Sequence, residues 1–529
     1  MLKFTGCDAA TLFSATQAAQ VLSGITRGFE KECLRVDAHG QLAQTGHPGA
    51  LGSKLTHPWI TTDYAESLLE FITPPSQDPD FPLAFLRDIH RYTAQNLSGE
   101  TMWPGSMPCE VGEDKDIALA NYGTSNSARI KYVYRNGLGL RYGRPMQTIA
   151  GVHYNWSLPE AFWPFLYQCH GASGSMQDFV SARYFGLLRN FLRYSWLIPY
   201  LFGASPAVNK SFVQGRTSDL LPLGDSTLGI STLYGPHATC LRMSDLGYQN
   251  RVQASLNVSF NSVTEYAQAL DAAIHTPDPF YTAIGVRDGD AHDAPWKQLN
   301  ANVLQIENEF YAGIRPKRIG LHGERPATAL QKYGVQYVEV RLFDLNPLID
   351  IGIAPEQSSF ADAFLLMCLL RDSPPITSRE QSENDENKRR VVTRGREPDL
   401  KLLVHNTEQA MQPLAHELFD DMQPFAAILD TAYGGNRYAT TLAQLRGRID
   451  LPESTPSAQV LAGIQAHGGL VAYTLHLSEQ HHSSLLGQTL DQATNEKFKR
   501  AAIDSLLEQK ALEAKPQIPF EDYVAQYYA

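Results

Sequence analysis

The sequence predicts an α+β fold, in which a curved, mainly antiparallel sheet is backed by helices and carries a charged site on its concave face. Two observations support this prediction. Several segments alternate apolar and polar residues, which is typical of strands that bury one face. The polar faces of these segments repeatedly carry carboxylates, together with a histidine and an arginine. A sheet packed on helices through its apolar face would bring these groups together on the other face.

The first such segment covers residues 28–36 and places Glu30 and Glu32 on one face of an extended strand. Two carboxylates at this spacing repel each other, so solvent, a basic side chain or a divalent metal must relieve the repulsion. An exposed strand face is the common explanation of such a pair, because acidic residues are mostly exposed. Repetition of the pattern in later segments favours a shared site instead.

Later segments, at widely separated positions, also carry polar or charged residues on one face. Glu70 lies between two apolar residues, Leu69 and Phe71, in a strand that Pro74 closes. The other polar faces are formed by His153 and Asn155 in residues 151–157, Ser255 and Asn257 in residues 255–260, and Glu339 and Arg341 in residues 335–343. Helical patterns cover residues 9–23, 82–97, a segment after 126, and 184–202.

The chain as a whole is expected to have two parts. Residues 1–350 are expected to form the catalytic core. Residues 351–529 are expected to be a mostly helical C-terminal part that packs on the core and is not an independent domain. The charge run at residues 378–390 predicts a solvated helix or loop.

Composition narrows the class of protein. The 529 residues are 43% hydrophobic and carry a net charge of −12, which argues against a general nucleic-acid or anionic-membrane binder. The six cysteines contain no C-x-x-C pair, so reduced thiols are expected. The first residues lack the apolar core of a signal peptide. We therefore expect a cytoplasmic protein with no nucleic-acid or membrane partner.

A group of carboxylates on one face of a rigid sheet is suited to binding hard divalent cations. Mg²⁺, or Mn²⁺ as the alternative, binds carboxylate oxygens and completes its shell with water and phosphate oxygens. Neither a Walker A sequence, a G-x-G-x-x-G fingerprint nor a G-x-S-x-G elbow is apparent. The residues alone thus leave two candidates, an ATP-using transferase or ligase and a metal-dependent hydrolase.

Specific motifs add a family resemblance. The sequence Arg27-Gly28-Phe29-Glu30-Lys31-Glu32-Cys33-Leu34-Arg35-Val36 is one of them. The others lie at residues 45–57, 59–63, 69–74, 102–104, 122–126, 151–155, 244–248, 304–309, 314–318 and 337–341. Over residues 20–350 the chain resembles the glutamate-cysteine ligases of proteobacteria.

The resemblance implies a function and a fold. The reaction would join the γ-carboxylate of L-glutamate to the amino group of L-cysteine through a γ-glutamyl phosphate, with ATP as co-substrate, as the first step of glutathione synthesis. The fold would be similar to that of glutamine synthetase. A related carboxylate-amine ligase with another amine acceptor and a non-catalytic nucleotide- and metal-binding relative are the alternatives. Glutathione is expected as a feedback inhibitor, and a monomer is expected.

The resemblance also implies roles for individual residues. The metal-site residues would be Glu30, Glu32, Asp63, Glu70, His153 and Glu339, of which Glu30 and Glu339 are also catalytic. The catalytic Arg341 would face the transferred phosphoryl group. The cysteine pocket would comprise Tyr64, Tyr134, Leu138, Gln147, Arg242, Tyr248 and Tyr311. Nucleotide contacts would come from Asn155, Arg315, Lys317 and Arg341. Tyr64 departs from the family pattern, where Phe is expected, and its hydroxyl is expected to make the thiol pocket more polar.

Overall fold

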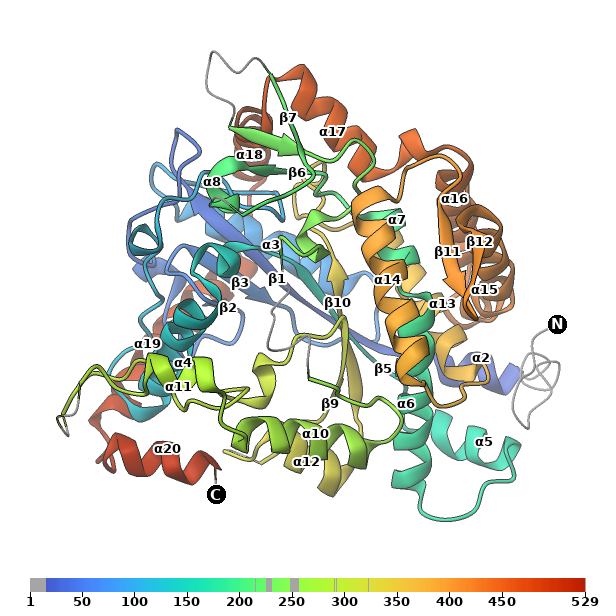
Figure 1. The fold of residues 1–529 in the computed structure, drawn as a ribbon, viewed down its shortest axis with the longest axis horizontal. Helices are drawn as coiled ribbons and strands as arrows, with labels where there is room; N and C mark the ends of the chain where they lie inside the picture. The colour runs from blue at the N-terminus through green and yellow to red at the C-terminus, as the bar shows by residue number, and fades with distance from the viewer. Residues whose placement is uncertain are drawn as a thin grey trace.

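A seven-stranded sheet lies at the centre of the protein (Figure 1). The computed structural model describes residues 16–214, 216–224, 231–247, 256–289, 291, 293–321 and 323–528. The strands run in the order β2-β3-β1-β5-β10-β9, with β4 paired to the far end of β1, and every one of these pairings is antiparallel. They are β1 (Thr26–Val36), β2 (Ile60–Thr62), β3 (Leu68–Ile72), β4 (Thr101–Met102), β5 (Val152–Ser157), β9 (Ile314–Lys317) and β10 (Tyr337–Phe343).

The strand register brings the predicted polar residues onto one face. Glu32 lies directly opposite Glu70, and Glu30 lies opposite His153. Glu339 lies opposite Asn155 on one side and Arg315 on the other. Directly opposed residues share a face of the sheet. The predicted α+β architecture, with an antiparallel sheet that collects the charged residues, is therefore confirmed.

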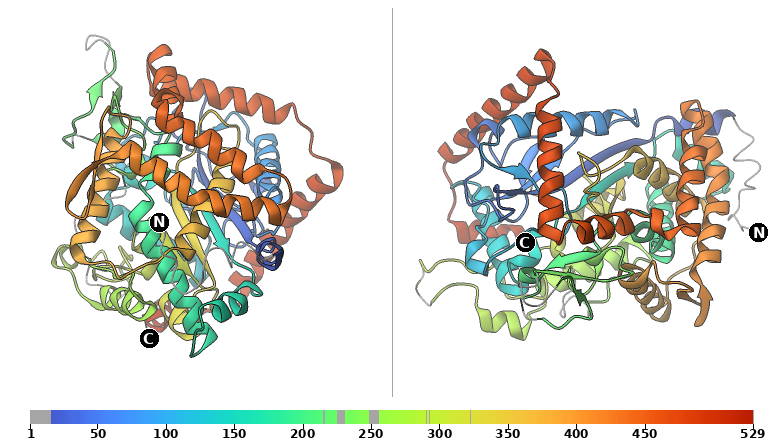
Figure 2. Two further views of the ribbon diagram at one scale, coloured as in Figure 1. Left: turned by 90° about the vertical axis from the view of Figure 1, so that its right-hand side faces the viewer. Right: turned by 90° about the horizontal axis from the view of Figure 1, so that it is seen from above.

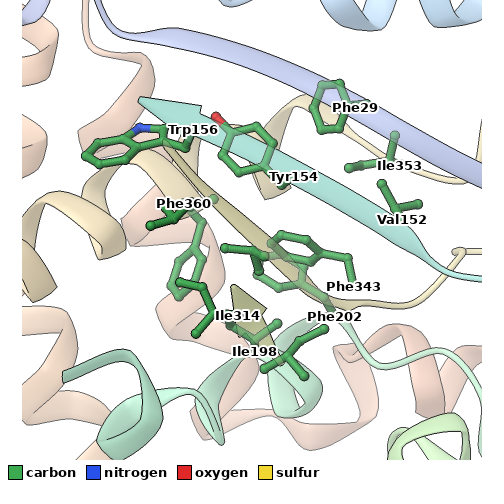
Figure 3. Close-up of a cluster of buried hydrophobic side chains, with 14 of the residues drawn as sticks. Phe29, Val152, Tyr154, Trp156, Ile198, Phe202, Ile314, Phe343, Ile353 and Phe360 are labelled. Atoms are coloured by element: carbon green, nitrogen blue, oxygen red, sulfur yellow. The ribbon is translucent and has the colours of Figure 1, made fainter. Parts of the chain in front are cut away.

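The opposite face of the sheet forms the main hydrophobic core. Phe29, Tyr154 and Trp156 project from β1 and β5, and Phe202 and Phe360 from the covering helices meet them (Figure 3). Each buried side chain of this size contributes about 1.5–3 kcal/mol to folding. The helices on this face are α3 (Phe81–Gln95), α6 (Met176–Tyr194), α7 (Leu197–Phe202) and α13 (Pro355–Leu370).

The remaining helices surround this centre. Those that precede residue 350 are α2 (Thr16–Leu22), α4 (Asn126–Tyr142), α5 (Phe162–Cys169), α8 (Lys210–Val213), α10 (Val263–His275), α11 (Pro279–Ile284) and α12 (Pro326–Tyr333). Two small sheets accompany them, β6 (Ala207–Asn209) with β7 (Leu221–Pro222) and β8 (Thr232–Tyr234), and the pair β11 (Lys401–Val404) and β12 (Thr407–Ala410).

Residues beyond 350 are mostly helical and lie on several sides of the N-terminal part (Figure 2). One continuous hydrophobic cluster includes residues from both parts, from Ala19 to Phe498. The helices, besides α13, are α14 (Ser378–Arg394), α15 (Met411–Tyr433), α16 (Arg437–Asp450), α17 (Pro456–Ala466), α18 (Leu470–Leu486), α19 (Gln492–Ala514) and α20 (Phe520–Tyr528). The division of the chain at residue 350 stays a prediction.

Two local predictions differ from the structure. Residues 256–260 form no strand, and Ser255 lies outside the described residues. The polar residues there serve local bonds instead: Ser259 Oγ donates to Glu265 Oε2, and Ser262 Oγ caps α10 by accepting from Glu265 N. The stretch 184–202 is two helices, α6 and α7, separated at residues 195–196. The predicted helix at 9–23 is seen as α2, and residues 9–15 lie outside the described part.

Within the described part of the chain, no helix combines the length and apolarity that crossing a membrane requires.

Candidate active site

A cavity of about 440 Å³ opens on the charged face of the main sheet. Its floor is formed by alternate residues of β1, β3, β5, β9 and β10. Its walls come from α4, from the segment 299–311 and from α20. The lining residues are Glu30, Glu32, Asp63, Glu70, Ile130, Lys131, Tyr134, Arg135, Leu138, Tyr142, Met146, Gln147, His153, Leu299, Ile306, Asn308, Glu309, Tyr311, Arg315, Lys317, Glu339, Arg341 and Tyr527.

Three of the predicted metal residues form a tight cluster at the centre of the floor. One possible ligand atom each from Glu30, His153 and Glu339 lies within 4.8 Å of the others. His153 Nδ1 is 3.2 Å from Glu30 Oε2, and Asn155 Nδ2 donates to Glu30 Oε1 at 2.9 Å. Two carboxylates and an imidazole at this spacing are a donor set that suits a divalent cation.

The protonation states of this cluster favour metal binding. Burial lowers the pKa of His153, and the nearby Arg341 cation lowers it further, which keeps the imidazole neutral. Burial is the largest single influence on Glu30 and raises its pKa, but the interactions with His153 and the Lys317 cation together outweigh it and leave that pKa below its usual range. A neutral imidazole and an ionised carboxylate are the forms that coordinate cations.

Three basic side chains border the same cluster beside Glu339. Lys317 Nζ lies 3.4 Å from Glu339 Oε1, and Arg341 Nη1 lies 3.4 Å from Glu339 Oε2. Arg315 Nη1 is 3.9 Å from Glu339 Oε2. Burial would raise the pKa of Glu339, but the three cations hold it well below the usual range. Cations next to a metal site are suited to the oxygens of a polyphosphate.

A second group of carboxylates extends the floor toward α4. Asp63 lies close enough to Glu32 and Glu70 for its charge to affect their ionisation. Burial and then the charge of Asp63 raise the pKa of Glu32 to about 8, and the same two causes raise the pKa of Glu70 well above its usual range. Arg135 Nη2 donates to Asp63 Oδ1 at 3.1 Å. The raised pKa values indicate that nearby basic groups do not fully offset the negative charges of Glu32 and Glu70. These carboxylates are therefore suited to binding additional divalent cations.

The predicted cysteine-pocket residues divide into three groups. Tyr134, Leu138, Gln147 and Tyr311 line the cavity. Tyr64 and Arg242 are not among its lining residues. Tyr248 lies outside the described residues.

Arg242 is buried beneath the floor, with only 1% of its surface exposed. Its Nε donates to Asp344 Oδ1 at 2.7 Å, and its Nη2 donates to the backbone carbonyls of Arg341 and Phe343. Its assignment to the cysteine carboxylate stays a prediction. Asn155, also absent from the lining, acts on the cavity through its hydrogen bond to Glu30.

The extra hydroxyl of Tyr64 is buried, and it has no hydrogen-bond partner among the residues that the structure describes. A Cβ atom built on Gly139 would lie 2.4 Å from this oxygen, so the hydroxyl points at α4. The expected increase in polarity of the thiol pocket therefore has no support in this geometry.

A Tyr64→Phe variant is expected to be more stable by up to about 1 kcal/mol, because it removes a buried hydroxyl without a partner. Its KM for cysteine should change less than about twofold. Thermal unfolding and steady-state kinetics test both expectations. Tyr134→Phe is the matched comparison, since it removes a hydroxyl from a tyrosine that lines the cavity. A large rise in KM for Tyr64→Phe alone would contradict this interpretation.

Several lining residues were not assigned from the sequence. Lys131 and Arg135 lie one turn apart on α4, a spacing that helical periodicity could have revealed. Glu309 is held by Arg141 at 3.1 Å and by the hydroxyl of Tyr142. Tyr527, on α20, carries no local signal, because only the tertiary fold brings it to the cavity.

Comparisons with known proteins agree with this site. The family model described as glutamate-cysteine ligase matches residues 10–391. The chain is 50% identical to a glutamate-cysteine ligase of Alcanivorax borkumensis over 514 residues, which is 97% of each chain. It is 47% identical to one of Pseudomonas aeruginosa over 98% of this chain and 97% of that protein.

Two solved structures are similar to this chain in fold. A crystal structure of glutamate-cysteine ligase from Francisella tularensis in complex with AMP has a TM-score of 0.88 and 35% identity, and the match covers 96% of this chain and 97% of that one. A bifunctional glutathione synthetase from Pasteurella multocida, at 23% identity and a TM-score of 0.74, shares the fold over 94% of this chain and 58% of that one. From the matched family model, the extent of identity to its curated relatives and the fold, the chain belongs to the glutamate-cysteine ligase family of enzymes.

Proposed function

We propose that this enzyme joins the γ-carboxylate of L-glutamate to the amino group of L-cysteine at the expense of ATP, the first step of glutathione synthesis. The observation that carries the proposal is the gathering of the six predicted metal-site residues in one cavity, with three basic side chains beside Glu339. Family membership supports the reaction, and the AMP bound to the Francisella tularensis enzyme supports the use of a nucleotide.

The proposed reaction has two steps. A carboxylate oxygen of glutamate takes the γ-phosphoryl group of ATP, and the bond between that phosphorus and the ADP oxygen breaks. The cysteine amine then attacks the acyl carbon, phosphate leaves with the acyl oxygen, and the amine loses a proton. The acyl phosphate replaces a poor leaving group with a good one, which lowers the barrier to amide formation.

Residues at different positions in the cavity have different proposed roles in these two steps. Glu30, His153 and Glu339, with Glu32, Asp63 and Glu70, would hold Mg²⁺, or Mn²⁺ as the alternative. The bound cations would offset the negative charge of the phosphate oxygens. Arg341, with its planar fork, would face the transferred phosphoryl group, and Arg315 and Lys317 would hold the nucleotide phosphates.

The amine acceptor is proposed to bind at the opposite end of the cavity. Among the residues that line the cavity, Tyr134, Leu138, Gln147 and Tyr311 provide aromatic, aliphatic and amide surfaces. This mixture suits a small side chain such as that of cysteine, and it places the amine next to the carboxylates of the floor. The resemblance further suggests that glutathione, which contains both joined substrates, competes for this end.

The metal assignment predicts an unusual pH dependence of stability. Without metal, Glu32 has a pKa of about 8 in the folded protein, above the ordinary value of 4.5. Between these values the unfolded chain releases a proton that the folded protein keeps, so the contribution of Glu32 to stability is lost as pH rises toward about 8. Mg²⁺ holds the ionised form and should raise the Tm more at pH 8 than at pH 6.

Thermal unfolding at pH 6, 7 and 8, in chelator and in Mg²⁺, measures this effect. Glu32→Gln cannot ionise, and it should reduce the pH dependence of the Mg²⁺-induced rise in Tm. An equal rise at all three pH values in the wild type would contradict the assignment of Glu32.

The proposed function is tested by phosphate release from Mg-ATP and L-glutamate, with and without L-cysteine, together with mass detection of γ-glutamylcysteine. Cysteine-dependent release with stoichiometric dipeptide is the expected result. Dipeptide formation only with 2-aminobutyrate or ammonia would identify another amine acceptor. No release with any amine would indicate a non-catalytic relative. Inhibition by glutathione and the mass in solution test the proposed feedback and the monomer.

A further inference from the structure

Strand β10 is irregular at the residue that is proposed to face the phosphoryl group. Its register against β5 is regular from Val338 to Val340, and it shifts before Phe343 pairs with Val152. Arg341 lies inside this irregularity. Its N–H still donates to the carbonyl of Gly313 at 2.9 Å on the β9 side. The direction of the Arg341 side chain therefore depends on what holds the bulge on its other side.

A buried guanidinium holds the bulge from below. Arg242 Nη2 donates to the carbonyl of Arg341 at 3.2 Å and to the carbonyl of Phe343 at 2.9 Å. One carbonyl belongs to Arg341, inside the irregularity, and the other to Phe343, at its end, so a single side chain ties the two together. Arg242 lies outside the sheet, in a short turn at residues 241–243.

Asp344 in turn fixes the position of Arg242. Its Oδ1 accepts from Arg242 Nε at 2.7 Å, and its Oδ2 accepts from Ala204 N at 2.9 Å and from Ser205 Oγ at 2.7 Å. The Sγ of Cys240 lies 3.1 Å from Oδ1. Asp344 is fully buried, and both of its oxygens are occupied by donors. A buried carboxylate with this number of donors has a single orientation.

The same guanidinium also lies against the backbone that holds Glu32. A Cβ atom built on Gly151 would be 2.8 Å from Arg242 Nη1, so the two groups are in contact only because residue 151 is glycine. The N–H of Gly151 donates to Glu32 Oε2 at 2.7 Å. Arg242 thus supports Arg341 on one side and, through Gly151, a carboxylate of the floor on the other.

We propose that Asp344 is a positioning residue for phosphoryl transfer: it orients Arg242, which holds the β10 bulge that directs Arg341 into the cavity. Asp344 does not line the cavity, and it acts through Arg242. This proposal rests on the proposed ligase function. It extends the role of Arg242 beyond contact with the cysteine carboxylate, because the bulge is needed before any amine arrives.

The test compares Asp344→Asn with the same change in a matched buried ion pair on the apolar side of the sheet. Arg27 of β1 and Asp362 of α13 are joined at 2.7 Å and buried to the same degree, and neither lines the cavity. An asparagine at either position keeps the shape of the side chain but presents an amide group to a buried arginine. Asp362→Asn and Asp344→Asn should therefore both lower the Tm.

Hydroxylamine as the amine acceptor distinguishes the two possible roles of Arg242, which are positioning of Arg341 and contact with the cysteine carboxylate. It traps an acyl phosphate as the hydroxamate, and it has no carboxylate for Arg242 to contact. With hydroxylamine, Asp344→Asn is expected to lower kcat at least about tenfold, and Asp362→Asn should keep kcat within about twofold of the wild type. Ser205→Ala, which removes one donor to Asp344, should lower kcat less and in the same direction.

The outcomes are distinct. Wild-type kcat for hydroxamate formation in a folded Asp344→Asn protein, or in folded Ser205→Ala if the former does not fold, would overturn the proposal. A rise in KM for cysteine with unchanged hydroxamate formation would also overturn it, since only substrate contact would then be affected. Absence of hydroxamate and dipeptide in the wild type would instead refute the proposed function itself.

Discussion

Replacing Glu339 with Gln is expected to reduce turnover by about three orders of magnitude, which corresponds to ~4 kcal/mol of transition-state stabilisation. Glu339 is the carboxylate that the metal cluster shares with the basic groups, since it faces Glu30 and His153 as well as Arg315, Lys317 and Arg341. The neutral amide would remove a negative ligand from the proposed metal site. It also leaves three cations without the carboxylate between them.

The Mg²⁺ dependence of turnover and a thermal unfolding curve check this prediction. Glu339→Gln should require more Mg²⁺ for half-maximal activity while the protein remains folded, and Glu30→Gln should behave in the same way. Glu417→Gln is the control, because this exposed residue of α15 does not line the cavity. Wild-type turnover in folded Glu339→Gln protein would remove the metal assignment.

Replacing Arg341 with Lys is expected to lower kcat by about two orders of magnitude with little change in the KM for cysteine. Lysine keeps the positive charge beside Glu339, but it loses the planar fork that can bind two phosphoryl oxygens at once. The loss should fall on the phosphoryl-transfer step, because Arg341 lies beside Glu339 together with Arg315 and Lys317, which are proposed to hold the nucleotide phosphates.

Hydroxamate formation and dipeptide formation should fall by the same factor in Arg341→Lys, since both depend on the acyl phosphate. Arg500→Lys serves as the control, because Arg500 is largely exposed on α19. A loss confined to dipeptide formation would show that Arg341 acts on the amine and not on the phosphoryl group.

The parts of the fold that the sequence predicted share one physical property. Strands β5 and β10 each carry apolar side chains on one face, and on the other face they carry the polar groups of the cavity, so the period of two is visible in the sequence. The same pattern at residues 256–260 was misleading, because Ser259 and Ser262 are polar for local bonds at the start of α10. Alternation indicates a strand only where the polar face has no local hydrogen-bonding role.

The candidate site was predictable to the extent that its residues lie on the sheet or in recognisable motifs. The register that places Glu32 opposite Glu70 depends on strand pairing, which alternation does not specify. The burial of Arg242 depends on Asp344, about one hundred residues further along the chain. Tyr527 reaches the cavity only through the packing of α20 against α4 and the segment near Leu299.

The position of Tyr527 also affects when the enzyme can become active during its synthesis. The acidic floor is complete once β10 has left the ribosome, because Glu30, Glu70, His153 and Glu339 all precede residue 344. The wall that α20 contributes is translated last among the described elements. Chains fold from the N-terminus as they emerge. A growing chain therefore carries the acidic residues of the floor before the cavity has the wall to which Tyr527 contributes.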